Sequence, residues 1–220
     1  MMNFRSQAGI WNPENQKLEP IIIGVGSTGS FIGLTLAKMG FKNIQIIDFD
    51  KVEEHNIPNQ FYRVDDKDSL KTDALGEIIK DFSGTEVKKI NQKIEEDFEF
   101  EIGLNSVLVV CVDNMEVRKL IYKKVKEMPI ILLDTRFGSE GFSIHTVDLT
   151  DEEEREKYEK SLERPVVDTP CGMKGVIYTI LSLAAETCNI LKKLDQNEPY
   201  PTILRREMKT YLFISKTKHL

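Results

Sequence analysis

The chain of 220 residues is 40% hydrophobic and 30% charged with a net charge of −6, which is typical of a globular protein and gives no basic footprint for nucleic acid. No apolar run reaches the roughly 20 residues of a membrane span, and residues 1–7 lack the apolar core of a secretory signal. Three widely spaced cysteines and no CxxC pair argue against disulfides and a zinc site, so we expect a reduced, cytoplasmic protein that binds no membrane.

The apolar pattern alternates between strands and helices along the first 133 residues. Short, wholly apolar runs are typical of strands buried on both faces of a parallel sheet, and apolar residues spaced three and four apart are typical of helices. In chain order these segments are a strand at 21–25, a helix at 27–39, a strand at 44–48, a helix at 70–82, a strand at 107–112, a helix at 116–127 and a strand at 130–133. This order predicts an α/β protein with a Rossmann-like, doubly wound, mostly parallel sheet.

The last third of the sequence departs from this alternation. A strand is predicted at 141–147, and residues 151–170 are interpreted as a highly charged helix followed by a crossover loop with two prolines. Residues 176–191 are apolar almost all round, which indicates a long buried helix, and residues 209–215 are predicted to form a closing strand. We expect the C-terminal strands to run antiparallel.

A glycine-rich loop follows the first predicted strand. Gly24, Gly26 and Gly29 match GxGxxG, and Ser27 opens the helix behind them. Glycines at these positions let the backbone approach a phosphate, and a helix N-terminus offers free N–H groups and a partial positive charge. Asp48 ends the second strand, where a carboxylate can accept hydrogen bonds from both ribose hydroxyls. We therefore predict a nucleotide site rather than a glycine-tolerant turn beside an unrelated acid.

The residues after Asp48 indicate which nucleotide binds. A second acid, Asp50, is followed by a polar stretch that includes Asn56 and Asn59, and Lys71 stands at the start of the next predicted helix. Acids, amides and a lysine beside a phosphate loop suit a triphosphate better than a dinucleotide, because Mg²⁺ prefers carboxylates and phosphate oxygens and a lysine gives a point charge. We predict ATP with Mg²⁺.

Asp113 follows the strand at 107–112, at the carboxyl end where ligands of such sheets bind. A carboxylate there faces the phosphate region and is a candidate magnesium ligand. The alternative is that Asp113 caps the helix at 116–127, a role for which Asp and Asn are both suited. Since Asn114 can serve as the cap instead, we favour the metal role for Asp113.

Together these segments resemble the ThiF/MoeB/HesA superfamily, the bacterial relatives of ubiquitin-activating enzymes. The resemblance covers roughly residues 21–194 and rests on GVGSTGS after the first strand, IDFD at 47–50, the stretch 56–60, Lys71, CVDN at 111–114 and a loop around Cys171. The segments at 134–141 and 170–179 look more like the uncharacterised mobile-element branch than the molybdopterin or thiamin enzymes.

The resemblance implies a single adenylation domain over residues 1–220, in which residues 1–20 form an N-terminal arm. It implies that the C-terminal carboxylate of a ubiquitin-like or sulfur-carrier protein, or of a peptide, attacks the α-phosphate of ATP, which gives an acyl-adenylate and pyrophosphate. Asp48 would hold the ribose, Lys71 the phosphates and Asp113 the catalytic Mg²⁺. Asp50 and Asn56 would line the same site.

Two more residues take roles from the resemblance. Arg5 falls close to an arginine that completes the site of the partner subunit in many relatives, which implies a homodimer. Cys171 matches a cysteine that accepts the activated acyl group or sulfur in some relatives and is unused in others. Its place in a loop before a predicted helix favours the thiolate, whereas Cys111 and Cys188 lie in apolar segments and are expected to be packing residues.

Other functions stay open. Asn59 stands where the family usually has an arginine, which removes a cation from the phosphate site unless Arg63 or Arg136 replaces it, and this keeps an inactive scaffold as an alternative. The first strand, its loop and Asp48 also fit an NAD-dependent oxidoreductase, but that function gives the later acids and the lysine no shared role. The paired CxxC motifs of the family are absent, so no structural zinc is expected.

Overall fold

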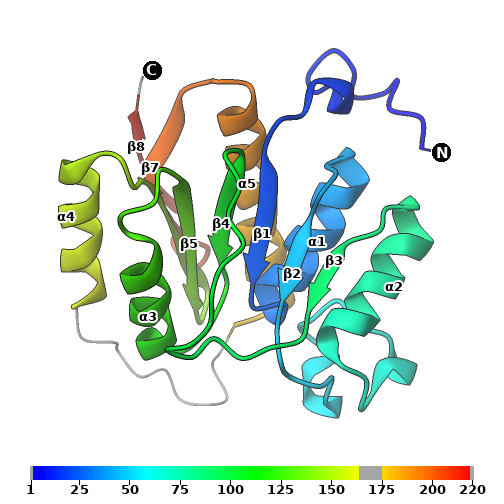
Figure 1. The fold of residues 1–220 in the computed structure, drawn as a ribbon. Coiled ribbons are helices and arrows are strands. Elements are labelled where there is room, and N and C mark those ends of the chain that lie inside the picture. Colours follow the sequence, from blue (N-terminus) through cyan, green and yellow to red (C-terminus); the bar gives the residue numbers. More distant parts are fainter. Residues whose placement is uncertain (1, 164–174, 219–220) are drawn as a thin grey trace.

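In the computed structural model, which describes residues 2–163 and 175–218, each strand and helix predicted before residue 134 is present (Figure 1). The first part of the chain contains β1 (Glu19–Ile23), α1 (Ser27–Met39), β2 (Gln45–Ile47), α2 (Lys71–Ser83), β3 (Lys88–Ile90), β4 (Ser106–Val110) and α3 (Met115–Val125). The second part contains β5 (Ile131–Gly138), β6 (Gly141–Asp148), α4 (Glu152–Leu162), α5 (Ile177–Asp195), β7 (Tyr200–Glu207) and β8 (Leu212–Lys218).

Within the described residues, eight strands form one sheet in the order β3-β2-β1-β4-β5-β6-β7-β8. The strands from β3 to β5 pair in parallel, and those from β5 to β8 pair antiparallel. The chain winds from β1 in one direction to β2 and β3 and then in the other direction to β4 and β5. This arrangement confirms the predicted Rossmann-like α/β fold with antiparallel strands at the C-terminal end.

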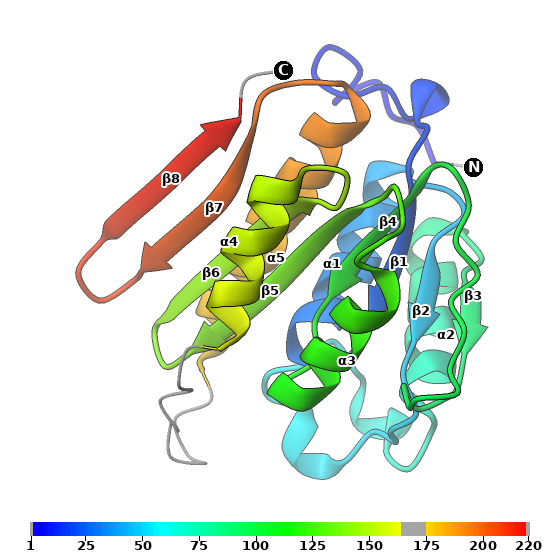
Figure 2. The ribbon, with the colours of Figure 1, turned by 60° about the vertical axis from the view of Figure 1, so that its left-hand side comes forward.

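Helices cover both faces of the sheet, with α1, α2 and α5 on one face and α3 and α4 on the other (Figures 1 and 2). The apolar run of β1 supplies both layers, because successive side chains of a strand point to opposite faces. Ile22 packs in the cluster that contains α1 and α5, whereas Ile21 and Ile23 pack in the cluster that contains α3. All three side chains are buried, which explains why this part of the strand is a run of isoleucines.

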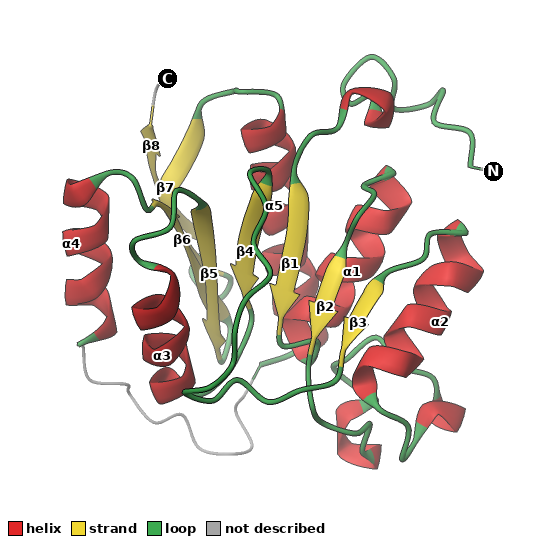
Figure 3. Ribbon diagram, in the orientation of Figure 1, coloured by secondary structure: helices red, strands yellow, loops and turns green. Residues whose placement is uncertain are grey.

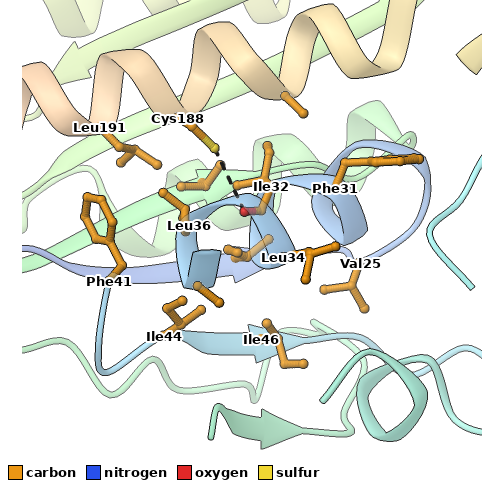
Figure 4. Close-up of a cluster of buried hydrophobic side chains, with 14 of the residues drawn as sticks. Val25, Phe31, Ile32, Leu34, Leu36, Phe41, Ile44, Ile46, Cys188 and Leu191 are labelled. Atoms are coloured by element: carbon orange, nitrogen blue, oxygen red, sulfur yellow. Dashed lines mark hydrogen bonds between the residues drawn. The ribbon is translucent and has the colours of Figure 1, made fainter. Parts of the chain in front are cut away.

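The long helix predicted at 176–191 is α5, which continues to Asp195. It packs on α1 and on β5 and β6. Figure 4 shows Cys188 of α5 in this core, with its thiol 3.9 Å from the carbonyl oxygen of Ile32. Burial raises the pKa of the Cys188 thiol, in keeping with a packing residue. No helix in the described part of the chain is long and apolar enough to cross a membrane.

The structure corrects the strand prediction near both ends of the sheet. The strand predicted at 209–215 was wrong in its bounds, since residues 208–211 form a turn and β8 begins at Leu212. β7 was not predicted because it contains Pro201, which cannot donate to a ladder, and the register between β7 and β8 shifts between Pro201 and Ile203. β3 was also missed, because its two lysines are exposed and leave no apolar pattern.

Candidate nucleotide-binding site

The carboxyl ends of β1, β2 and β4 lie side by side, so that the loops after these strands meet at one edge of the sheet (Figure 3). β1 leads into the glycine loop, β2 leads into Asp48, and β4 leads into the segment that carries Asp113. β1 lies between the other two strands, and the chain leaves it in opposite directions, which makes this edge the switch point of the sheet. Ligands of open α/β sheets bind at such a point.

The glycine loop has the close contacts that its sequence predicts. Gly24 has a φ of +85°, and a Cβ on it would lie 3.2 Å from the carbonyl carbon of Cys111, so a side chain there would be strained and would crowd the loop after β4. A Cβ on Gly29 would lie 2.0 Å from the carbonyl oxygen of Gly24, so Gly29 is what lets α1 begin against the loop. Gly26 precedes α1 without a side-chain cap, which leaves the first N–H groups of the helix available to an anion.

Asp48 holds the glycine loop and the loop after β2 together. Its Oδ2 accepts a hydrogen bond from the N–H of Val25 at 2.8 Å, and its Oδ1 accepts one from the N–H of Asp50 at 2.8 Å. Burial raises the pKa of Asp48 above its ordinary value of 3.8, while these N–H groups and the charge of Lys71 act in the opposite direction. Each carboxylate oxygen retains a lone pair that a ribose hydroxyl can use.

Lys71 opens α2 beside this carboxylate and is almost fully buried, with 8% of its side chain exposed. Its Nζ lies 3.0 Å from Oδ2 of Asp50, and its N–H donates to the carbonyl oxygen of Asp50 at 2.9 Å. Asp50 is half exposed and therefore reachable by a ligand. The structure thus brings Asp48, Asp50 and Lys71 together around the glycine loop.

Asn56 and Asn59 lie in the polar stretch that leads to α2. Asn56 is buried, and its Oδ1 accepts a hydrogen bond from the N–H of Glu53 at 3.0 Å. The carbonyl oxygen of Asn56 accepts the N–H of Asn59 at 3.1 Å, and Asn59 is half-buried. In this structure the side-chain oxygen of Asn56 therefore shapes its own turn.

The segment after Asn59 is attached to the glycine loop and to the first turn of α1. The N–H of Phe61 donates to Oγ of Ser30 at 3.0 Å. The hydroxyl of Tyr62 donates to the carbonyl oxygen of Val25 at 2.6 Å. These two bonds fix the polar stretch against the site, although neither contact was predicted from the sequence.

Asp113 is exposed and precedes α3, whose cap is the neighbouring residue. The Oδ1 of Asn114 accepts hydrogen bonds from the N–H of Glu116 at 2.8 Å and from the N–H of Val117 at 3.2 Å. Since Asn114 fills the capping role, Asp113 is not needed as the cap of α3, and it lies at the carboxyl end of β4.

A buried charge network lies behind Asp113 and was missed by the sequence analysis. Arg118 of α3 donates to the carbonyl oxygen of Val112 and forms an ion pair with Asp134 of β5, whose exposed fraction is 0%. Burial lowers the pKa of Arg118 to about 10, so it stays charged at neutral pH. Arg136 Nε lies 2.7 Å from the second oxygen of Asp134, and Tyr158 of α4 donates to the same oxygen at 3.0 Å. The network thus anchors the carbonyl that precedes Asp113.

This network also accounts for Arg136, one of the two arginines considered in place of the arginine missing at Asn59. Arg136 is engaged by Asp134 and donates to the hydroxyl of Ser161 at 3.1 Å. The other candidate, Arg63, lies 2.5 Å from the carboxylate of Asp81. Both guanidinium groups therefore have carboxylate partners of their own.

Arg5 lies far from the glycine loop of its own chain. Gln7 and Trp11 donate to the carbonyl oxygen of Met39, the last residue of α1, at 2.9 and 2.8 Å. α1 has 13 residues and is about 20 Å long, and the glycine loop precedes its first residue. The N-terminal segment runs at the opposite edge of the sheet (Figure 1), so Arg5 does not contribute to the site within this chain. Cys171, the other predicted catalytic residue, lies outside the described residues.

The chain matches the profile described as the ThiF family over residues 13–214. It is 32% identical over 104 residues to the NEDD8-activating enzyme E1 catalytic subunit of Arabidopsis thaliana, a match that covers 46% of this chain and 23% of that relative. The chain therefore spans less than a quarter of the curated relative that it matches.

Two solved structures show the same fold. The structure of E. coli MccB with ATP has a TM-score of 0.74 and 15% identity, over 93% of this chain and 65% of that chain. The structure of PaaA has a TM-score of 0.68 and 17% identity, over 94% of this chain and 74% of that chain. At these identities the likeness is one of architecture.

Proposed function

The chain belongs to the ThiF family, and we propose on that basis that it uses ATP to activate a carboxylate as an acyl-adenylate, with release of pyrophosphate. The observation that supports this most is the meeting of the glycine loop, Asp48 and the Asp50–Lys71 pair at the carboxyl ends of β1 and β2. The N-terminus of α1 suits phosphates, a carboxylate suits the ribose hydroxyls, and a lysine suits a further phosphate.

The proposed reaction needs no nucleophile from the protein. An oxygen of the substrate carboxylate forms a bond to the α-phosphorus of ATP, the bond to the bridging oxygen of pyrophosphate breaks, and the electron pair leaves with pyrophosphate. The chain supplies position and charge: Asp48 holds the ribose, the N–H groups of α1 hold phosphate, and Lys71 offsets negative charge.

Mg²⁺, when bound, would neutralise charge on the phosphates. In nucleotide sites such an ion takes one or two carboxylates from the protein, and phosphate oxygens and waters supply its other ligands. The exposed carboxylate of Asp113 fits this ligand set. In the described part of the chain no group of three or more His, Cys, Asp or Glu is placed to hold a metal ion on its own, and the absence of zinc stays a prediction.

For the substrate we propose the C-terminal carboxylate of a ubiquitin-like protein, a sulfur-carrier protein or a peptide. The Arabidopsis relative is named for the activation of NEDD8, and E. coli MccB has been solved with both AMPCPP and MccA. Both names support a protein or a peptide as the second substrate of this chain.

Pyrophosphate exchange into ATP tests the proposal, with exchange expected only when a carboxylate substrate is added. In the same preparation, Mg-ATP at 100 times its dissociation constant should add about 2.7 kcal/mol to the free energy of unfolding, and NAD should add nothing. Stabilisation by NAD alone would instead support the oxidoreductase. Stabilisation by ATP without exchange for any carboxylate would support the inactive scaffold, which Asn59 favours.

We also propose a homodimer in which Arg5 completes the neighbouring site, since Arg5 lies at the wrong end of α1 to serve its own. Arg5→Ala and Asp113→Asn should each lower exchange as pure variants. A mixture of the two should recover activity, because one site of each mixed dimer then has both intact residues. Lys17→Ala, which removes another exposed cation from the N-terminal segment, is the control and should leave exchange unchanged. Two results would contradict the proposed role of Arg5: a fully active Arg5→Ala variant, or no recovery of activity in a mixture in which the two variants are shown to form mixed dimers.

A further inference from the structure

The carboxamide of Gln60 lies beside the glycine loop with one unpaired end. Its Oε1 is buried and has no hydrogen-bond partner among the described residues. A Cβ on Gly26 would lie 3.8 Å from Nε2 and 3.9 Å from Oε1, so the carboxamide lies against the residue after which α1 begins. Buried polar groups nearly always have a partner, so an unpaired carboxamide end beside the glycine loop is a departure that needs an explanation.

The backbone holds Gln60 in this position from both sides. Its own N–H donates to the carbonyl oxygen of Asn56 at 2.9 Å. The next two residues are bonded to Ser30 Oγ, just after the glycine loop, and to the carbonyl oxygen of Val25 within it. The backbone that carries the carboxamide is therefore fixed before any ligand arrives, which lowers the entropic cost of a contact made there.

We propose that Gln60 is a phosphate-contacting residue, whose carboxamide donates an N–H to a phosphate oxygen of the nucleotide at the N-terminus of α1. A carboxamide carries two donors and one acceptor, and half a turn about its last torsion exchanges the two ends at the same place. The uncapped first turn of α1, on which the carboxamide lies, is where phosphate binds in such loops. This inference rests on the proposed use of ATP.

A neutral donor has a particular value in this chain. Asn59 occupies the position of the usual arginine, Lys71 is held by Asp50, and Arg63 is held by Asp81. The contact from Gln60 adds a donor to the phosphate site without adding a charge. Replacement by glutamate, which has the same shape, removes the donors and places a negative charge against the phosphate, whereas methionine removes the polarity alone.

Calorimetric titration of adenosine, AMP and Mg-ATP into the full chain tests the role of Gln60. Gln60→Met should bind ATP about tenfold more weakly and Gln60→Glu more weakly still, because a hydrogen bond to a charged group is lost and then replaced by repulsion. Both variants should bind adenosine as the wild type does. The control is Gln196→Glu, the same substitution at an exposed residue after α5, whose Nε2 donates to the carbonyl oxygen of Ile10 in the N-terminal segment.

Each outcome decides the inference. Unchanged ATP affinity in folded Gln60→Met overturns it while the use of ATP stands. Equal losses for adenosine and ATP overturn it as well, since Gln60 would then shape the pocket instead of contacting phosphate. A wild type that binds neither ligand refutes the proposed function and this inference with it. If Gln60→Glu does not fold, Gln60→Met decides alone.

Discussion

The Nζ of Lys71 lies 3.0 Å from Oδ2 of Asp50 at the first turn of α2, where the helix presents the positive end of its dipole. A buried cation at that end is unfavourable unless an anion lies close to it. Asp50 is this anion in the structure, and it is half exposed beside the glycine loop. The phosphates of a nucleotide would be a second anion for the same ammonium group.

Lys71→Met should therefore weaken the binding of Mg-ATP by about 10- to 100-fold, the usual size of one charge-assisted contact, and leave adenosine binding unchanged. The free energy of unfolding should change little, because the carboxylate left behind at Asp50 can be hydrated. Calorimetry with both ligands and a urea titration measure the two effects. If Lys71→Met weakens the binding of adenosine by the same factor as the binding of ATP, Lys71 is not a phosphate ligand.

Asp48 should make nucleoside binding depend on pH. Only the ionised carboxylate accepts hydrogen bonds from both ribose hydroxyls, and burial raises the pKa of Asp48 above 3.8. Adenosine affinity is therefore expected to fall as the pH is lowered, in a range that begins above pH 3.8. Asp48→Asn should bind adenosine weakly and without this dependence. Equal pH profiles for the two proteins would contradict the assignment.

The same pKa shift affects stability with the opposite sign. Because the folded-state pKa of Asp48 is raised, folding favours its protonated form, so its contribution is present below the unfolded-state pKa and is lost as the pH rises through the folded-state value. The stability of the wild type relative to Asp48→Asn should thus decrease from about pH 4 to neutral pH. Urea titrations of both proteins across this range measure the difference. A difference that grows with pH would mean that the N–H bonds and Lys71 outweigh burial.

Two alanine substitutions in the glycine loop should separate folding from binding. Gly29→Ala places a methyl group 2.0 Å from the carbonyl oxygen of Gly24, so the loop must move and stability should fall. Gly26→Ala makes only an ordinary contact of 3.8 Å with Gln60, so the fold should tolerate it, but the methyl group lies where phosphate must approach. Thermal unfolding and ATP titration of both variants check this. A Gly26→Ala variant with normal ATP affinity would place the phosphates elsewhere.

Removal of the buried carboxylate of Asp134 should be costly. Asp134→Asn leaves Arg118 and Arg136 without a carboxylate partner at a position with 0% exposure, and breaking a buried ion pair in this way typically costs about 3–5 kcal/mol. Urea unfolding measures the loss. The exposed pair of Lys67 and Glu54 is the control, since Glu54→Gln should change stability far less. Comparable losses in the two variants would mean that the network contributes little.

The parts of the fold that could be predicted are those in which one local signal is sufficient. The apolar run of β1 and the glycines after it define strand, loop and helix together, and Asp48 follows from the spacing. β3 and β7 could not be predicted in this way, because Lys88 and Lys89 face solvent and Pro201 argues against a strand. Those strands form because a neighbouring strand is already in place, which is information that no local window contains.

The site shows the same division. The loops that meet at the switch point could be predicted because parallel topology brings the carboxyl ends of strands to one edge. The ion pair of Arg118 with Asp134 could not be predicted. A charged residue taken alone is expected to be exposed, and only the tertiary structure brings these two side chains together. For the same reason the predicted strand was too short: β5 continues through Asp134 to Gly138, although the apolar pattern ends at residue 133. Arg5 could be placed in the N-terminal arm but not at the far end of α1.

The last prediction separates the roles of Asp113 and Cys171. Adenylation needs charge neutralisation at the phosphates, which a carboxylate that holds Mg²⁺ supports and a thiol does not. Asp113→Asn should lower pyrophosphate exchange by about 10²–10³-fold, the usual loss for one preorganised electrostatic group. Cys171→Ser should leave exchange nearly intact and affect only a later transfer of the acyl group or of sulfur.

Asp97→Asn, the same change at an exposed carboxylate, is the control for Asp113→Asn. Asp97 adjoins Glu96, which accepts hydrogen bonds from Lys123 and Lys124 at the end of α3, whereas Asp113 precedes the start of that helix. All three variants are measured in one exchange assay with their unfolding curves. If folded Cys171→Ser loses exchange while Asp113→Asn retains it, activation proceeds through the thiol and the roles assigned to these two residues are wrong.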